Sequence, residues 1–337
     1  MNSPKRIRQL GRAAAVWCKL IHWKNGQQRG LLVAVLVCLL AGTVATFCTA
    51  SLSTFTFTKA FVQNTSDRNA FSTKRPPGFI NQKVDSKRLN NFRKYVSAHT
   101  GKSPGSLDKA ISLRRWARDQ QSDNPEAWLP PYLDDSEDPE SLLGQQRQGY
   151  HSACRRFSYI LTGALLSEGF DARVVYASED FLKNGQHHTL VEVWIEDLRK
   201  WVLLDPTLDT LILVNGIPAS LLEIFSSVST NPDMHLISFR RDGSPHKPAP
   251  TLAAYKKIFR HIFIANTNAI FDGYGMRLFG TKRISFLHFS GDGIESYPQV
   301  KKEFLLICGM VSAVAFALSG LTILPTLLRK MIPLRGR

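Results

Sequence analysis

Three residue types that together support nucleophilic catalysis follow one another along the chain: Cys154, the pair His187-His188, and Asp205. Cys154 begins a segment with the apolar spacing of a helix. We therefore expect its thiol at a helix N-terminus, where the positive end of the helix favours the thiolate. The thiolate is the nucleophilic form of cysteine. For Cys154 alone, a buried and inert thiol is the alternative.

A base for this thiol must come from a more distant part of the chain. His187 and His188 open an expected strand that runs to Ile195, and their side chains should point to opposite faces because orientation alternates along a strand. Asp205 ends a second expected strand that begins at Trp201, and the charged turn between the strands predicts an antiparallel hairpin. Either histidine could then lie near the carboxylate, which would fix its tautomer and stabilise imidazolium.

Three motifs in this order resemble the transglutaminase-like superfamily. Residues 154–173, CRRFSYILTGALLSEGFDAR, resemble its cysteine-bearing helix, which ends in Gly-x-x-Ala-Arg. HTLVEV, from His188, resembles its histidine strand, and WVLLDPT, from Trp201, resembles its Trp-x-x-x-Asp-Pro-Thr motif. The resemblance covers about residues 105–210, and the order of the motifs makes it more specific than any single motif.

The resemblance implies a papain-like α+β fold, in which the cysteine helix packs on an antiparallel sheet that bears the histidine and aspartate. It implies Cys154 as the nucleophile, His188 as base and acid, and Asp205 as the orienting group. The match of Glu192 to the family motif selects His188 over His187. The implied activity is that of a cysteine hydrolase, a protease or amidase, or of an acyltransferase that works through a thioester.

An oxyanion hole needs hydrogen-bond donors aimed at the developing negative charge. The backbone N–H of Cys154 is the expected first donor. Gln148 has the papain-like offset for a second donor, Tyr150 is an alternative, and Gln148 is equally readable as a solvated loop residue. The chain departs from the family at Leu190 and Arg155, where tryptophan is common, and these changes affect the walls of the acyl pocket.

We expect no cofactor and no metal. His151, Cys154 and either neighbouring histidine could supply zinc-type ligands, but neither Cys-x-x-Cys nor His-Glu-x-x-His spacing supports such a site. The formal charge of +16 would suit a nucleic-acid binder, but residues 1–29 carry +7 and residues 329–337 carry +4, without acidic residues. The remaining +5 is modest, so we expect no nucleic-acid partner.

Two long uncharged runs predict membrane spans. They are Gly30–Thr58 and Phe304–Leu328, and a span needs roughly 20 apolar residues. Because basic residues concentrate on the cytoplasmic side, both termini should be cytoplasmic and residues 53–303 outside, although Lys301 and Lys302 oppose the rule. The first run could instead be a signal peptide cleaved near Ala50; we expect an uncleaved anchor because the run is long.

The expected organisation follows the chain in order. A cytoplasmic tail (1–29), a span (30–52) and a linker (53–85) precede an outer domain (86–303) with an appendage at 211–300, then a span (304–328) and a tail (329–337). Within the appendage, 253–271 has helical spacing and 284–288 alternates like a strand.

Three hypotheses for the function remain. The first is an enzyme of a bacterial inner membrane, with a periplasmic domain that acts on a peptide or another amide-bearing substrate. The second is an inactive binding or scaffold module within a cell-envelope or polysaccharide assembly. The third is a redox-sensing thiol, which would need no Asp205. The presence of Cys154, His188 and Asp205 together favours the enzyme.

Overall fold

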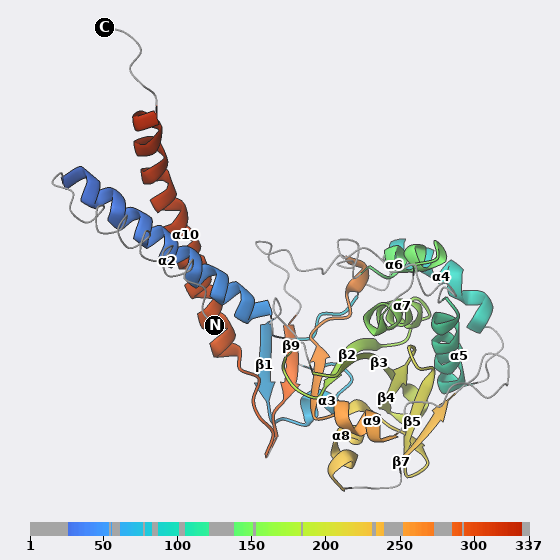
Figure 1. The fold of residues 1–337 in the computed structure, drawn as a ribbon. Helices are drawn as coiled ribbons and strands as arrows, with labels where there is room; N and C mark the ends of the chain where they lie inside the picture. The colour runs from blue at the N-terminus through green and yellow to red at the C-terminus, as the bar shows by residue number, and fades with distance from the viewer. Residues whose placement is uncertain are drawn as a thin grey trace, which may run out of the picture. The chain divides into compact units, whose positions relative to one another are not determined.

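The computed structural model describes residues 26–53, 55, 61–76, 78–82, 87–100, 105–120, 138–150, 153–182, 185–230, 234–238, 252–272, 285–291 and 293–331. The chain divides into two units (Figure 1). One is formed by the end segments Met1–Ser53 and Val300–Arg337, and the other is the domain Thr54–Gln299.

The unit of end segments contains two long helices, α2 (Gly26–Ser53) and α10 (Gln299–Met331). Glycines allow the two helices to approach closely, since a Cβ on Gly42 would lie 3.3 Å from the Phe316 ring and one on Gly309 3.3 Å from Cys48 Cβ. Small residues at a contact are typical of helices that pack in a membrane.

One helix in the described part of the chain is long and apolar enough to cross a membrane, at Leu32–Leu52. It is either an anchor or a signal sequence. The structure thus supports one such helix where the sequence predicted two. The second predicted run, 304–328, lies in α10, and no second helix that could span a membrane is found in the described part of the chain.

The domain is built on one mixed sheet. Its strands are β1 (Phe61–Thr65), β2 (Ala172–Ser178), β3 (His187–Ile195), β4 (Lys200–Asp205), β5 (Thr210–Val214), β6 (Ile217–Pro218), β7 (Met234–Ser238), β8 (His261–Ala265) and β9 (Ser285–Phe289). The strand order is β1-β9-β8-β2-β3-β4-β5-β6, with β7 also paired to β5. The β1–β9 pair is parallel, and the other pairs are antiparallel. The expected hairpin of β3 and β4 is confirmed.

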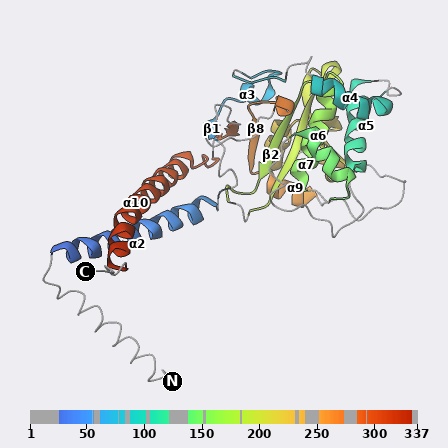
Figure 2. The same cartoon turned by 90° about the horizontal axis from the view of Figure 1, so that it is seen from above.

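Helix α7 (Cys154–Ser167) is the central helix and is buried along almost its whole length. It packs on β2 and β3, and α4 (Lys87–Thr100), α5 (Ser106–Asp119) and α6 (Pro139–Arg147) surround it (Figure 2). Its apolar side chains recur at helical spacing, as the sequence predicts, and Gly169 follows it with a positive φ of 86° that favours glycine. The mixed α+β class is confirmed.

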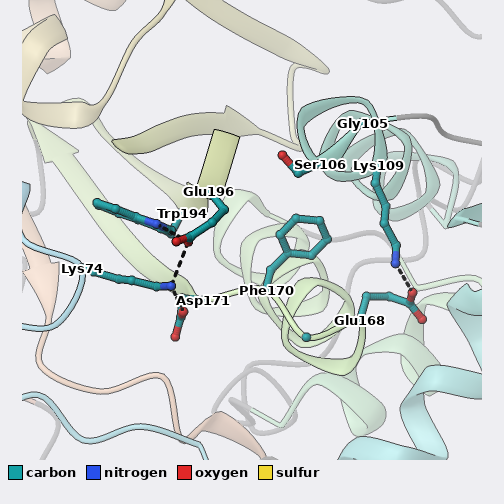
Figure 3. A pocket seen from close by; sticks show the side chains of 10 residues that line it. Lys74, Gly105, Ser106, Lys109, Glu168, Phe170, Asp171, Trp194 and Glu196 are labelled. Carbon is teal, nitrogen blue, oxygen red and sulfur yellow. Dashed lines mark hydrogen bonds and ion pairs between the residues drawn. The ribbon is translucent and has the colours of Figure 1, made fainter. Parts of the chain in front are cut away.

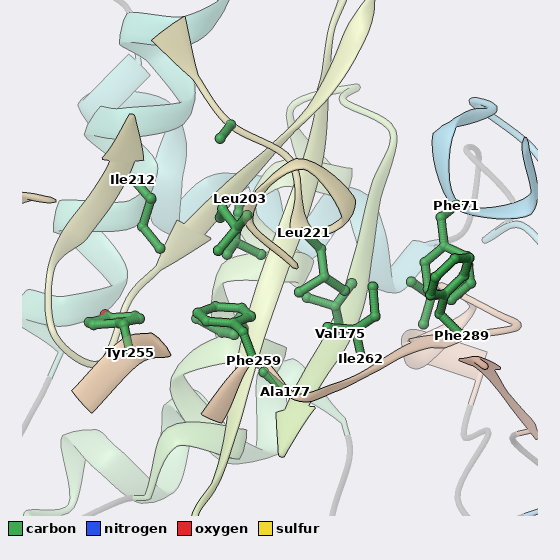
Figure 4. Close-up of a cluster of buried hydrophobic side chains, with 14 residues drawn as sticks. Phe71, Val175, Ala177, Leu203, Ile212, Leu221, Tyr255, Phe259, Ile262 and Phe289 are labelled. Atoms are coloured by element: carbon green, nitrogen blue, oxygen red, sulfur yellow. The ribbon is translucent and has the colours of Figure 1, made fainter. Parts of the chain in front are cut away.

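A second layer, α8 (Leu221–Thr230) and α9 (Leu252–Ile258), covers a hydrophobic cluster on the sheet. Figure 4 shows Val175, Ala177 and Leu203 of the sheet beside Leu221 and Tyr255 of these helices. This burial fixes α9 against the central strands, which matters because α9 reaches the candidate site.

The segment expected to be a linker, 53–85, differs from that expectation. It contains β1 and α3 (Asn69–Ser72), and Phe71 is buried in the core. The backbone oxygens of Phe71 and Thr73 accept hydrogen bonds from Arg173 and from Trp201. Strand β1 pairs with β9, which lies far along the chain, so the local sequence gave no sign of β1.

Residues 211–300 are an integral part of the sheet rather than an appendage, because they supply β5 to β9. The predicted helix at 253–271 was wrong beyond Ile258, where α9 ends and β8 follows. All five residues of β8 are buried, and a central strand reads as a continuous apolar run whose period cannot be told from that of a helix. The predicted strand at 284–288 is confirmed as β9.

Candidate active site

Cys154 is the first residue of α7, and its thiol is half-buried. Ala153 at the N-cap supplies no side-chain hydrogen bond to the first N–H groups of the helix. One turn further, Ser158 Oγ donates a 2.8 Å hydrogen bond to the carbonyl oxygen of Thr189. The helix that bears the thiol is therefore fastened to the strand that bears the histidine.

His188 and Asp205 meet across the hairpin, with 2.7 Å between Nε2 and Oδ2. Extending the β3–β4 register places Asp205 opposite Leu190, so His188 is its diagonal neighbour on the same face. His188 is 9% exposed and Asp205 2%. His187 is exposed, with Nδ1 3.2 Å from the Gly185 carbonyl oxygen.

The Cys154 thiol lies beside His188 and Thr189. Its Sγ is 3.8 Å from Thr189 Oγ1. Burial would raise the pKa of the thiol, but the hydrogen bond and positive charge of His188, with the backbone N–H and hydroxyl of Thr189, lower it below its ordinary value. Because Nε2 of the imidazole is engaged by Asp205, Nδ1 is the ring nitrogen left for the sulfur.

The imidazole of His188 is stabilised as imidazolium. Burial opposes its charge, yet the Asp205 carboxylate and the Cys154 thiolate outweigh burial and raise the His188 pKa to about 10. A lowered thiol pKa and a raised imidazole pKa together favour a thiolate–imidazolium pair at neutral pH. Such a pair is an activated nucleophile with its proton donor already in place.

Asp205 accepts four hydrogen bonds. Oδ1 accepts from the backbone N–H groups of Thr207 (2.9 Å) and Leu208 (3.1 Å). Oδ2 accepts from His188 and from the hydroxyl of Tyr255. Burial would raise the pKa of this carboxyl, but His188 and these donors hold it below its ordinary value. The carboxylate is therefore fixed in orientation as well as in charge.

Tyr255 of α9 is the residue of this site that sequence reasoning missed. Its hydroxyl donates to Asp205 and lies 2.7 Å from Thr210 Oγ1. Burial and the adjacent carboxylate raise the Tyr255 pKa well above its ordinary value, so the hydroxyl stays protonated. In the sequence Tyr255 looked like one member of an apolar helical face. The one signal in the sequence was the tyrosine hydroxyl itself, since a buried tyrosine hydroxyl usually has a hydrogen-bond partner.

Other residues of the family motifs hold the fold together instead of lining the site. Glu192 forms a buried ion pair with Arg173, at 2.7 Å to Nη2, and its other oxygen accepts from the backbone of Leu221 at 2.7 Å. The Arg173 guanidinium lies 4.1 Å from the centre of the Trp201 ring. Leu190 is buried in the hydrophobic cluster. These residues fix β2, β3 and β4 relative to one another.

The proposed second oxyanion donor, Gln148, is exposed at the end of α6, and its side chain has no hydrogen-bond partner among the described residues. Tyr150 is half-buried, and His151 lies outside the described residues. No group of three or more potential metal-ligating side chains occurs in the part of the chain that the structure describes.

A separate cavity of about 480 Å³ lies between α5, the end of α7 and the far end of β3 (Figure 3). Its charged side chains pair with one another: Lys74 with Asp171 at 3.1 Å and with Glu196 at 3.0 Å, and Lys109 with Glu168 at 2.9 Å. Trp194 on its wall is at the opposite end of β3 from His188, so this cavity is not part of the candidate active site.

One of the comparisons with known proteins finds a similarity to a protein family. Residues 93–206 match the model of the transglutaminase-like superfamily. No curated protein matches the chain. A solved structure described as "a Putative Cysteine Protease from Cytophaga hutchinsonii" matches 37% of this chain and 40% of its own length, at 15% identity and a TM-score of 0.28, a value that does not establish a shared fold. The segment that matches the family model includes all three of Cys154, His188 and Asp205, and it is about a third of the chain.

Proposed function

We propose that the domain is a cysteine hydrolase that cleaves an amide bond through a thioester. The observation that carries the proposal is the 2.7 Å contact of His188 Nε2 with Asp205 Oδ2, together with a Cys154 thiol whose pKa is lowered by His188. The family-motif residues Glu192, Arg173 and Trp201 contact one another and hold the strands together, whereas Cys154 and His188 meet beside Asp205 with shifted pKa values, as is typical of a functional site.

In the proposed reaction the Cys154 thiolate attacks the carbonyl carbon of the amide, and the negative charge moves to the carbonyl oxygen. The Cys154 backbone N–H at the start of α7 is the donor available for that oxygen. The imidazolium of His188 then gives its proton to the leaving nitrogen, and the C–N bond breaks. Neutral His188 next takes a proton from water, which attacks the thioester and releases the acid.

Of the two reactions that could resolve the thioester, we propose hydrolysis rather than transfer to an amine. Transfer requires a site that excludes water and positions the acceptor. The family's aromatic positions that would wall such a site are here Leu190 and Arg155, and Leu190 is buried in the hydrophobic cluster rather than exposed to the site. An added primary amine distinguishes the two reactions, because a transferase would form the amine adduct at low millimolar amine.

The proposed location is the extracytoplasmic side of a bacterial inner membrane. The helix Leu32–Leu52 would be the first anchor and 304–328 a second, with both basic tails in the cytoplasm. Reporters that work in one compartment, fused to each terminus and to a loop of the domain, test this arrangement. A C-terminus outside the cell would contradict two spans, and loss of residues before about 50 from the mature chain would contradict an uncleaved anchor.

An inactive binding module within an envelope or polysaccharide assembly is the second candidate. Its specific support is the exposed position of Gln148, which leaves the oxyanion site with one identified donor.

Amide hydrolysis tests both candidates. The full chain in detergent is incubated with a set of peptide aminomethylcoumarin amides, and release of the fluorophore is followed. Wild type should release it, and Cys154→Ala should not. Asp205→Asn should lower turnover by about 10⁴, as the amide favours the wrong tautomer and cannot stabilise imidazolium. Cys308→Ala, in the other unit, is the matched control and should retain activity. Release that persists in Cys154→Ala would overturn the enzyme proposal.

A further inference from the structure

A cavity of about 390 Å³ lies directly against His188. Leu208, from the turn after β4, and Tyr255 and Ile258, from α9, form an apolar wall, and residues 185–187 line the rest. This volume is near the lower end of ligand pockets, which range from about 300 to 1,000 Å³, and so suits a single side chain rather than a long polymer.

The cavity is held rigidly to the catalytic pair. The backbone N–H of Leu208 donates to Asp205 Oδ1 at 3.1 Å, and the hydroxyl of Tyr255 donates to Oδ2 of the same carboxylate. Two of the three wall residues are therefore anchored on the group that orients His188. A substrate group seated on this wall would have a fixed position relative to the imidazole, which is the condition for productive orientation.

The chemistry of the wall favours an uncharged apolar group. Leu208 is 38% exposed, and Ile258 is half-buried, so apolar surface stays accessible to a ligand beside a charged imidazole. None of the residues that line this cavity is acidic, and His187 and His188 are its titratable basic side chains. An ammonium group placed there would lose hydration without gaining an ion pair with an acidic side chain, whereas an apolar side chain would lose only its unfavourable contact with water.

We propose that this cavity is a specificity subsite that takes an apolar side chain on the leaving-amine side of the scissile bond. The side follows from the mechanism, since His188 is the group that protonates the leaving nitrogen and His188 borders the cavity. The inference rests on the proposed cysteine hydrolase function. The proposed subsite assigns the choice of leaving-amine side chain to α9 and to the turn after β4. Helix α9 lies outside the segment 93–206 that matches the family model.

Three probes test the subsite on the full chain in detergent: N-methyl-, N-isobutyl- and N-(2-aminoethyl)chloroacetamide. The Cys154 thiolate displaces chloride from each, so that one C–S bond forms as the C–Cl bond breaks, and the nitrogen substituent is directed to the side of the leaving amine. Each labelling rate is divided by the rate of the same probe with glutathione. The isobutyl probe should label wild type at least about tenfold faster than the methyl probe, and the charged probe no faster than the methyl probe.

Variants of Leu208 locate the effect. Leu208→Glu introduces a charge and Leu208→Ser removes the apolar side chain while keeping the backbone N–H to Asp205, and both should reduce the isobutyl-to-methyl ratio toward one. Ile217→Glu is the matched control on an exposed residue of β6 that does not line the cavity, and it should keep the wild-type ratio.

The outcomes separate the subsite from the function on which it rests. Fast labelling of wild type by all probes with a ratio near one, or a ratio that survives in both Leu208 variants, would overturn the subsite and leave the hydrolase proposal standing. A Cys154 that no probe labels faster than a free thiol of ordinary pKa would overturn both proposals.

Discussion

Ser158, one turn after Cys154 on α7, donates a 2.8 Å hydrogen bond to the carbonyl oxygen of Thr189, the neighbour of His188. Ser158 and Thr189 are both buried. This bond crosses from the helix to the sheet and sets the distance between the nucleophile and its base. It explains how a thiol on one element and an imidazole on another stay within reach without a direct link along the chain.

Ser158→Ala should destabilise the domain by about 1–3 kcal/mol, because a buried carbonyl loses its donor. It should also slow iodoacetamide labelling of Cys154 at pH 6, since α7 would be less firmly held against β3. Urea unfolding of the full chain, followed by tryptophan fluorescence, gives the stability. Ser72→Ala removes an exposed serine that bonds its own helix and should change neither quantity. Equal effects of the two variants would contradict the docking role.

The ion pair of Glu192 with Arg173 should be essential to stability. Glu192→Ala would leave the Arg173 guanidinium buried without its carboxylate and should cost about 3–5 kcal/mol. Glu196→Ala removes an exposed glutamate from the same hairpin, whose surface ion pair with Lys74 should contribute at most about 1 kcal/mol, so its shift in the urea midpoint should be small. A similar midpoint for both variants would indicate that the buried pair contributes nothing beyond its volume.

The stability of the domain should fall as the pH drops below about 6.5, partly because of His288. Burial and the neighbouring His261 lower the His288 pKa to about 3. Below the unfolded pKa of 6.5 the unfolded chain binds a proton that folded His288 refuses, so stability present above 6.5 is lost toward pH 3. At one pKa unit per 1.36 kcal/mol, this loss is about 2 kcal/mol between pH 6.5 and pH 5.

Comparison with His288→Gln isolates this contribution. The difference in unfolding free energy between wild type and variant should shrink as the pH falls from 6.5 to 5. His187→Gln is the control on an exposed imidazole and should leave the slope unchanged. A constant difference for His288→Gln across this range would contradict a buried neutral imidazole.

The sequence anticipated the local elements of the domain better than its long-range contacts. The helix at Cys154 and the hairpin of His188 and Asp205 are local, and their spacing carries their geometry. The strand β1 and the strand β8 were not anticipated, since β1 pairs with a partner far along the chain and β8 is apolar on both faces. Tyr255 was missed for the same reason: its contact with Asp205 depends on a long-range fold.

Tyr255→Phe should weaken the site without abolishing it. Asp205 would lose one of four donors, while His188, Thr207 and Leu208 remain. Loss of the donor should raise the Asp205 pKa and reduce turnover by about tenfold, the usual scale of a hydrogen bond to a charged group being about 1.5–3 kcal/mol. Tyr297→Phe removes a buried hydroxyl elsewhere in the domain and serves as the matched control. A pH profile of Cys154 labelling that is identical in wild type and Tyr255→Phe would reduce Tyr255 to a packing residue.

The central claim is that His188 holds Cys154 as a thiolate, and the rate of iodoacetamide labelling against pH tests it most directly. The His188 hydrogen bond and charge lower the thiol pKa, so wild type should be labelled well below the ordinary thiol pKa of about 8.5. In His188→Ala the burial of Cys154, which raises the thiol pKa, is no longer opposed by the imidazole, so labelling should begin only above about pH 8.5. His187→Ala changes the exposed neighbour and should give the wild-type profile. Superimposable profiles for wild type and His188→Ala would contradict the account.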